Sequence, residues 1–243
     1  MTDSPDSRTP LVLLHGLGAN RQAFQRFARL LPAHFEVHPL DLLGHGDAPK
    51  PERGYSLADY ATHLLEDLER LGLRAGDAAR RPIIAGHSLG AAVAVRAAAL
   101  THEAADKLVL LDPPAGTGRD TQRMLDAKLE GRLHETIEDL FPHFGEPLRR
   151  WTLGTWEQMA PGVARELNSH WHDWAAHVPT PVTVIHGDRS EGASGEGAHE
   201  HFPAARAIRI PGAGHFLHAT HAREVAQSLV DAIHQHRGAP DDA

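Results

Sequence analysis

The sequence predicts an α/β fold with a mostly parallel sheet of about six strands, flanked by helices. Six short and nearly continuous apolar runs recur along the 243 residues, as expected for parallel strands buried on both faces. Amphipathic stretches separate most of these runs, and strands that alternate with helices form parallel sheets. The length fits one domain, because single cores stop growing at roughly 250–300 residues.

The predicted strands coincide with the apolar runs, each of which has about the length of a strand. They are residues 11–14, 35–40, 82–85, 107–111, 181–185 and 207–210. No strand is expected between residues 114 and 178, a region that contains all four tryptophans. We predict a helical insertion there, over one end of the sheet. The predicted parts are a core at 10–113 and 179–237, a helical cap at 114–178, and flexible tails at 1–9 and 238–243.

Two helices carry clear boundary signals. Ser56 can cap a helix, with Asp59 three residues later as its capping-box partner. Apolar residues then recur at helical spacing until Gly72 ends the helix. Near the C-terminus, Thr220 precedes the same spacing over residues 222–233. We predict a helix on each of these stretches.

The composition excludes several classes of function. Lys and Arg number 24 against 32 Asp and Glu, a net charge of −8, whereas a nucleic-acid binder needs a basic face. Cysteine is absent, which excludes disulfides, thiolate metal sites and a cysteine nucleophile. No run reaches the ~18 apolar residues of a membrane span, and no apolar segment opens the chain as a secretory signal would. We expect a cytoplasmic protein with neither nucleic-acid nor membrane partners.

The strongest chemical signal is Gly86-His87-Ser88-Leu89-Gly90, which follows one apolar run and precedes an alanine-rich helix former. A G-x-S-x-G motif between a strand and a helix is a nucleophile elbow. Its glycines let the chain turn sharply, so that the serine is presented at the N-terminus of a helix. Free N–H groups and a positive dipole at that end favour a developing oxyanion. A glycine-rich turn with an idle serine is the alternative.

Two further motifs follow predicted strands. The first apolar run leads directly into His15 and Gly16, and the N–H of Leu17 is then a candidate oxyanion donor beside that of Leu89. After the last run, His215 stands at the C-terminal end of a strand, where α/β folds place their chemistry. Its place in the chain, after the serine and any acid, matches the order Ser…Asp…His. A plain tight turn and a surface histidine are the alternatives.

Together these motifs resemble the α/β-hydrolase superfamily, in its serine esterase and lipase branch. The resemblance covers nearly the whole chain, residues 10–236. It includes the stretch from Asp41 to Gly46, Asp-Leu-Leu-Gly-His-Gly, which is similar to the D-x-x-G-x-G turn of the family. The family carries a helical cap after its sixth strand, and residues 114–178 stand at that place.

The resemblance also implies roles for the motif residues. These are Ser88 as nucleophile, His215 as general base, and the N–H groups of Leu17 and Leu89 as oxyanion donors. The family usually opens with an antiparallel hairpin, for which the residues before Leu11 are too few and too polar. We therefore expect six strands without that hairpin.

The acid of the triad is left open by the sequence. The family's usual acid lies three residues after the glycine that closes the seventh strand, here Gly187, and that position is the uncharged Ser190. A triad needs a negative charge to hold the histidine tautomer and to stabilise its cation. Some branches carry the acid after the sixth strand, which is Asp112 here. Asp188 and Glu191 are the other candidates, and the absence of any acid is the last alternative.

The chain holds 20 histidines, which ordinarily titrate near neutrality. Two pairs have an H-x-H spacing that can chelate zinc on a strand. They are His170 with His172, and His199 with His201. Neither pair lies in a predicted strand and no third ligand is in register, so no metal site is expected. His218 is expected on the solvated surface rather than at the pocket mouth, and His87 either in the core or in the pocket wall.

These features predict a serine hydrolase that cleaves small, largely apolar carboxylic esters through an acyl-serine intermediate, without a metal or organic cofactor. One or two aromatic faces of the insertion are expected to line its pocket. The same fold hosts lactonases, thioesterases, carbon–carbon hydrolases and cofactor-free haloperoxidase side reactions. An alternative from another class is a ligand-binding pseudoenzyme, supported by the missing acid at Ser190. The oligomeric state stays open.

Overall fold

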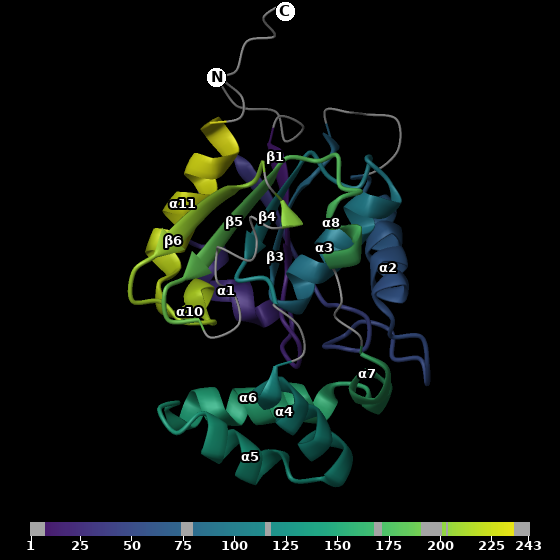
Figure 1. Ribbon diagram of the computed structural model, residues 1–243, viewed down its shortest axis with the longest axis vertical. Coiled ribbons are helices and arrows are strands. Elements are labelled where there is room, and N and C mark those ends of the chain that lie inside the picture. Colours follow the sequence, from purple (N-terminus) through teal and green to yellow (C-terminus); the bar gives the residue numbers. More distant parts are fainter. Residues whose placement is uncertain are drawn as a thin grey trace, which may run out of the picture.

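The computed structural model describes residues 8–73, 80–114, 118–167, 172–190, 201–202 and 204–235. In these residues six strands form one sheet in the order β2-β1-β3-β4-β5-β6, and every neighbouring pair is parallel (Figure 1). The strands are β1 (Thr9–Leu14), β2 (Phe35–Leu40), β3 (Ile83–His87), β4 (Lys107–Leu111), β5 (Val182–Gly187) and β6 (Arg206–Ile210). The predicted fold class is confirmed. In the described part of the chain, no helix is long and apolar enough to cross a membrane.

The strands begin and end close to the predicted apolar runs. β1 starts at Thr9, two residues before its run, so it includes a residue that we expected in the N-terminal tail. The register aligns Leu14 with Leu40, the last residue of β2, and with Gly86, the second-last residue of β3. Since all strands run in the same direction, their carboxyl ends share one edge of the sheet, and the turns that leave this edge carry the motif residues.

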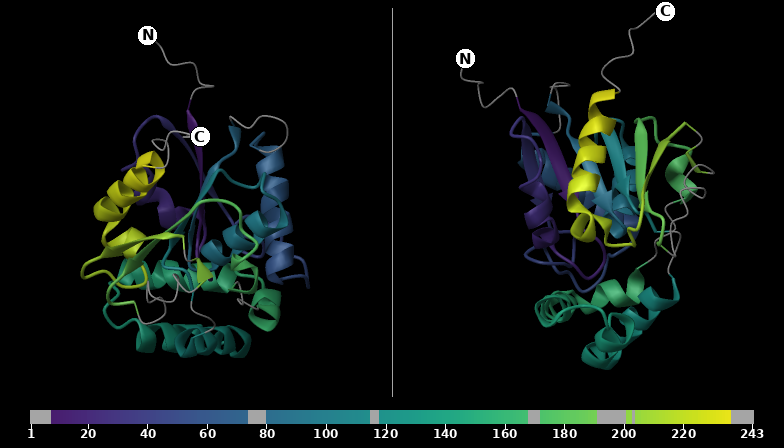
Figure 2. Two further views of the ribbon diagram at one scale, coloured as in Figure 1. Left: turned by 45° about the horizontal axis from the view of Figure 1, so that its top comes forward. Right: turned by 90° about the vertical axis from the view of Figure 1, so that its left-hand side faces the viewer.

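Helices cover both faces of the sheet (Figure 2). Side chains alternate along a strand, and in β1 this places Val12 and Leu14 on one face, with Leu11 and Leu13 on the other. The first face packs against α2 (Leu57–Arg70) and α3 (Leu89–Leu100). The second packs against η2 (Arg21–Phe24), α1 (Gln25–Ala28), α10 (Leu217–Thr220) and α11 (Ala222–Gln235). Burial on both faces explains why the central strands β1, β3 and β4 are largely apolar, whereas the edge strands β2 and β6 include charged residues such as Glu36 and Arg209.

The boundary signals of α2 act as predicted. Ser56 accepts a hydrogen bond from the N–H of Asp59, and the Asp59 carboxylate accepts the N–H of Ser56 in return. Gly72 follows the helix with a φ of +66°, in the left-handed region that glycine favours. The helix predicted over residues 222–233 is confirmed as α11, and Thr220 before it ends the short helix α10.

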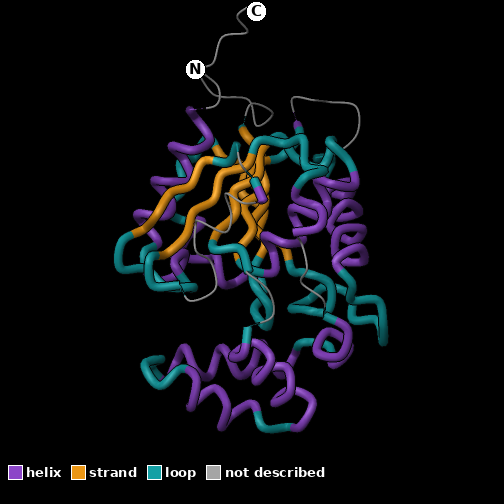
Figure 3. The backbone as a smooth tube through the Cα atoms, viewed as in Figure 1, coloured by secondary structure: helices purple, strands orange, loops and turns teal. Residues whose placement is uncertain are grey.

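Five helices lie between β4 and β5, and no strand interrupts them among the described residues (Figure 3). They are α4 (Arg119–Glu130), α5 (Leu133–Leu140), α6 (Glu146–Gln158), α7 (Pro161–Glu166) and α8 (His172–Ala175). α4, α5 and α6 lie beyond one end of the sheet, as expected for a cap. α8 differs, since the Arg96 guanidinium of α3 lies 4.7 Å from the centre of the Trp174 ring. The boundaries of the cap at residues 114 and 178 stay a prediction.

The helical insertion is tied to the core through α7. The N–H of Ala160 donates to the carbonyl of Gly44 over 2.8 Å. The Glu166 carboxylate accepts the N–H groups of Gly54 and Tyr55 over 2.8 and 3.2 Å. These bonds join the insertion to the loop that follows β2, which fixes one side of the insertion over the sheet edge.

Candidate active site

Ser88 stands at the tip of a strained turn between β3 and α3. Its φ of 49° and ψ of −116° are unusual for a residue with a side chain. A Cβ on Gly86 would lie 2.3 Å from the carbonyl oxygen of Gly90, and one on Gly90 would lie 2.4 Å from that of Leu14. Only glycine fits at both positions. The Ser88 side chain makes no capping hydrogen bond to α3, so its hydroxyl is not engaged in ending that helix.

The turn after β1 comes up beside Ser88. A Cβ on Gly16 would lie 3.3 Å from the Cβ of Ser88. The N–H of Leu89 belongs to the first turn of α3, where the helix dipole is positive. Leu17 and Leu89 therefore stand on two turns that meet at Ser88. Their role as oxyanion donors stays a prediction.

His215 is paired with Asp112. The Nδ1 of His215 lies 2.5 Å from Oδ2 of Asp112, which is fully buried, while 39% of the His215 side chain is exposed. Asp112 follows β4 directly and has a φ of 47°. In the described part of the chain, Ser88 and Asp112 are the non-glycine residues with positive φ. The two strained positions thus fall on the elbow serine and on the carboxylate that holds His215.

The Asp112 carboxylate has partners on both oxygens. Its Oδ1 accepts the N–H of Gly187 over 3.3 Å, and its Oδ2 accepts the hydroxyl of Ser190 over 2.5 Å. Asp188 is exposed, and its Oδ1 accepts the N–H of Gly212 over 2.7 Å. Glu191 lies outside the described residues. Of the carboxylates considered from the sequence, Asp112 is the one with a described contact to His215.

Two more histidines pack behind His215. His87 Nε2 lies 2.8 Å from the backbone oxygen of His215, so this nitrogen carries the proton and donates it. The ring centre of His87 lies 4.3 Å from that of His218, which is only 4% exposed. Burial lowers the pKa of His218 to about 3 and that of His87 well below its usual value. The expectation that His218 is solvated surface was therefore wrong, and His87 belongs to the core.

Buried His15 and His45 anchor the turn that leads to Leu17, although sequence reasoning gave them no role. His15 Nε2 accepts the N–H of Leu42 over 3.0 Å, so its Nδ1 donates to the carbonyl of Gly16 over 2.8 Å. His45 Nε2 accepts the N–H of Gly18 over 3.2 Å. Both rings are fully buried, and burial lowers the pKa of His15 to about 4 and that of His45 to about 3. Each ring works as a neutral clamp.

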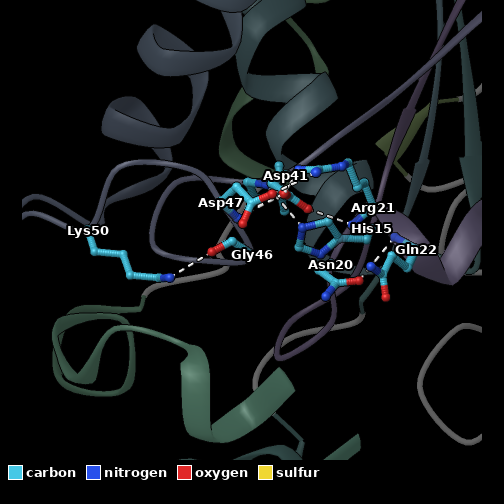
Figure 4. Close-up of polar contacts among 9 residues, drawn as sticks. His15, Asn20, Arg21, Gln22, Asp41, Gly46, Asp47 and Lys50 are labelled. Carbon is cyan, nitrogen blue, oxygen red and sulfur yellow. Dashed lines mark hydrogen bonds and ion pairs between the residues drawn. The ribbon is translucent and has the colours of Figure 1, made fainter. Parts of the chain in front are cut away.

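Asp41 joins the same turns from the outer side, as Figure 4 shows. Its carboxylate accepts the backbone N–H of Arg21 over 2.6 Å and the N–H of Asp47 over 2.9 Å, and it pairs with the Arg21 guanidinium. A Cβ on Gly46 would lie 2.4 Å from the Asp41 carboxylate carbon. Through Asp41, the predicted D-x-x-G-x-G turn after β2 is therefore hydrogen-bonded to the segment that follows β1.

The neutral clamps make the stability of the fold dependent on pH. The folded protein protonates His15 only near pH 4, whereas an unfolded chain does so near 6.5, so the stabilisation is complete above pH 6.5 and is lost as the pH falls toward 4. For His15 alone, the free energy of unfolding should fall by about 2 kcal/mol between pH 7 and pH 5. The glutamine amide of His15→Gln can both accept and donate but does not titrate. Between pH 7 and pH 5, urea unfolding should therefore show a fall in the free energy of unfolding that is about 2 kcal/mol smaller in this variant than in the wild type. The exposed His134→Gln should leave the loss unchanged, and an equal loss in His15→Gln would contradict the clamp.

Aromatic side chains lie close to the turn after β1 and to His215. A Cβ on Gly18 would fall 2.1 Å from the Trp156 ring, so α6 covers the turn after β1. Phe216, which is 39% exposed, has its ring centre 5.4 Å from that of His215. Phe141 and Phe144 stack on each other at 4.8 Å and lie about the Phe216 ring at 6.1 and 5.9 Å. A cluster of three phenylalanine rings therefore lies on one side of His215.

The H-x-H pairs are described only in part, because His170 and His199 lie outside the described residues. The rings of His172 and His201 have their centres 4.1 Å apart. No group of three or more histidine, aspartate or glutamate side chains suited to a metal ion occurs in the described ranges.

Comparison with known proteins finds relatives of several kinds. Uncharacterized mycobacterial proteins, among them one of Mycobacterium tuberculosis, are 36% identical over 101 residues, and the chain spans 28% of the length of that relative and 42% of its own. A pimeloyl-acyl-carrier-protein methyl ester esterase of Pectobacterium carotovorum is 38% identical over 166 residues, 66% of this chain and 59% of the esterase. A bromoperoxidase structure from Bacillus anthracis matches with a TM-score of 0.79 at 20% identity, covering 93% of this chain and 92% of the other.

The family model covers almost the whole sheet and the insertion. The model of the alpha/beta hydrolase family matches residues 11–228. This range includes the turn at Ser88, Asp112 at the end of β4, and the turn that carries His215. The fold, the order of the motifs and the matched length agree, and the chain belongs to the alpha/beta hydrolase family.

Proposed function

We propose that this hydrolase cleaves small, largely apolar carboxylic esters through an acyl-serine intermediate. The observation that carries the proposal is the 2.5 Å pair between His215 Nδ1 and the buried Asp112 carboxylate, at the sheet edge that also presents Ser88. The pair fixes the tautomer of His215, because Nδ1 donates to the carboxylate and leaves Nε2 as the ring nitrogen that can accept a proton.

The first half of the reaction forms the acyl-serine. His215 Nε2 takes the hydroxyl proton of Ser88 as its oxygen attacks the acyl carbon, and the carbonyl electron pair moves onto oxygen. The N–H groups of Leu17 and Leu89 receive that oxyanion. The intermediate collapses, the bond to the alcohol oxygen breaks, and the imidazolium of His215 gives its proton to the departing alcohol. The Asp112 charge stabilises the imidazolium throughout.

The second half repeats these steps with water. His215 removes a proton from a water molecule, whose oxygen attacks the acyl carbon of the ester formed on Ser88. The second oxyanion uses the same two N–H groups. Its collapse breaks the bond to the Ser88 oxygen, which takes the proton back from His215. The products are one carboxylic acid and one alcohol, and the protein returns to its starting state.

An ester substrate with apolar groups agrees with the surroundings of the site. Phe216 lies against His215, and Trp156 covers the turn at Gly18. Burying apolar groups against such rings is favourable by about 25 cal/mol per Å². Among the relatives, the Pectobacterium protein is named as a methyl ester esterase. A pseudoenzyme is less well supported, because the Asp112 carboxylate, which follows the neighbouring strand, is hydrogen-bonded to His215.

Covalent labelling tests the proposal directly. A fluorophosphonate probe should phosphonylate Ser88 with loss of fluoride, and peptide mapping should find one label per chain on that residue. Ser88→Ala should take up no label. A folded protein that stays unlabelled, or that is labelled elsewhere, would overturn the serine hydrolase assignment and favour a pseudoenzyme.

Phe216 should shape the choice of alcohol. Because His215 delivers the proton to the leaving alcohol, the adjacent Phe216 ring should contact the alcohol part of the ester, not the acyl part. In the wild type, each alcohol methylene in a series of butanoate esters should raise kcat/KM by up to roughly fourfold, the equivalent of about 0.8 kcal/mol. Phe216→Ala should flatten this series and preserve the dependence on acyl length. Leu148→Ala, an exposed apolar change on α6, is the control. A flattened acyl series with an intact alcohol series would contradict the placement.

A further inference from the structure

Ser190 is hydrogen-bonded to Asp112, although it occupies the position where the family usually carries its acid and is itself uncharged. It follows β5 in a tight turn, in which its N–H reaches the carbonyl of Gly187 over 3.5 Å. Its hydroxyl donates to Oδ2 of Asp112 over 2.5 Å. The same oxygen accepts Nδ1–H of His215, also over 2.5 Å. Two short bonds therefore converge on one carboxylate oxygen.

The other contacts of Asp112 leave its carboxylate dependent on that hydroxyl. The backbone N–H of Asp112 donates to the carbonyl of Ile185 over 2.8 Å, which fixes the main chain and not the carboxylate. Oδ1 has the longer 3.3 Å bond from the N–H of Gly187. The side chain is fully buried, so bulk water does not reach it. Apart from His215 itself, Ser190 gives the carboxylate its shortest described bond.

We infer that Ser190 is a positioning residue, whose hydroxyl orients the Asp112 carboxylate toward His215 and shares its negative charge. This inference rests on the proposed function, since it concerns the acid of the same triad. A hydrogen bond to a charged group is stronger than one between neutral groups, and a buried carboxylate needs such donors. The β5 turn thus serves the triad with a donor, while β4 supplies the charge.

Removing the hydroxyl has two consequences of known direction. The carboxylate loses the bond that sets its orientation, so the His215 ring that it holds is aimed less accurately at Ser88 and kcat falls. Its charge is also shared with fewer donors, which strengthens the remaining bond to His215 and favours the protonated ring. The acidic limb of the kcat/KM profile should therefore move to higher pH. A residue that only supports the fold would produce no such movement.

The test compares Ser190→Ala and Ser190→Thr in the full chain. With p-nitrophenyl butanoate, Ser190→Ala should lower kcat about tenfold with little change in KM, and it should shift the acidic limb upward. Ser190→Thr, which keeps a hydroxyl, should restore most of both. The matched control is Ser56→Ala, because Ser56 donates to the Asp59 carboxylate over the same 2.5 Å at the start of α2 and has no described contact with Ser88, Asp112 or His215. It should lower the melting temperature without changing kcat or the pH profile.

A spectroscopic measurement keeps this test separate from that of the proposed function. The proton between His215 Nδ1 and Asp112 should give a far-downfield ¹H NMR signal in the wild type at low temperature, whether or not esters are turned over. Ser190→Ala should move that signal and Ser190→Thr should return it. An unmoved signal, or an unchanged kcat and acidic limb in a folded Ser190→Ala protein, would overturn the role of Ser190. A wild type that hydrolyses no ester, but whose signal responds as expected, would overturn the proposed function alone.

Discussion

Ser88→Ala should abolish hydrolysis of p-nitrophenyl esters and leave a folded protein. The loss in kcat should be on the order of 10⁶, the scale for removing a serine nucleophile from an intact triad. The fold should survive because the substitution keeps the Cβ and removes only the hydroxyl at a φ of 49°, and because the side chain does not cap α3. The measurements are steady-state turnover and a thermal melt of both proteins.

A pre-steady-state burst of nitrophenol distinguishes turnover at Ser88 from hydrolysis by a contaminating esterase. In the wild type, the first turnover of a p-nitrophenyl ester should release one nitrophenol per chain if acylation is faster than deacylation. Ser88→Ala should show no burst. Hydrolysis at the wild-type rate in the variant would remove Ser88 from the mechanism, and with it the acyl-serine.

Asp112→Asn should lower kcat roughly 10⁴-fold, the loss seen when a triad aspartate becomes asparagine. The amide carries no charge to stabilise the imidazolium, and its NH₂ group can hold His215 in the wrong tautomer. Asp188→Asn is the matched control, because the Asp188 carboxylate is exposed and bonded to the N–H of Gly212. It should change kcat by less than about twofold, as is typical for a surface change.

The two variants decide between Asp112 and Asp188, which the sequence left open as candidates for the acid of the triad. A large loss in Asp188→Asn with an active Asp112→Asn would reverse the choice made from the 2.5 Å contact. Equal and small losses would mean that His215 acts without a carboxylate. Circular dichroism of each variant should exclude unfolding as the cause, since Asp112 is fully buried and accepts three hydrogen bonds.

The sheet could be predicted almost completely from the sequence. Central parallel strands covered on both faces are largely apolar, so a run such as Leu108–Leu111 marks the place of its strand. The cap was predictable as helical but not in its packing. The contact between Trp174 and Arg96 joins residues far apart in the chain, and no periodicity within the insertion announces that α8 lies against α3.

The site was predictable as far as motifs reach. The flanking glycines identify Ser88 as a candidate, and the order of the motifs in the chain identifies His215. The choice between Asp112 and Asp188, in contrast, depends on the direction of the turns after β4 and β5. Both residues follow strands, and only the three-dimensional register shows which one meets the ring. The buried histidines were missed because histidine is common on surfaces. The place of His15, directly after four apolar residues of a buried strand, was the available signal.

The backbone conformation at Ser88 has a consequence for how the protein would evolve. A non-glycine residue with φ of 49° and ψ of −116° costs about 1–3 kcal/mol relative to a relaxed conformation. Glycine would relieve that cost, so Ser88→Gly should melt at a higher temperature than the wild type. Selection for thermal stability alone would therefore discard the serine. Its presence at this strained, partly buried turn indicates that stability was not the property being kept there.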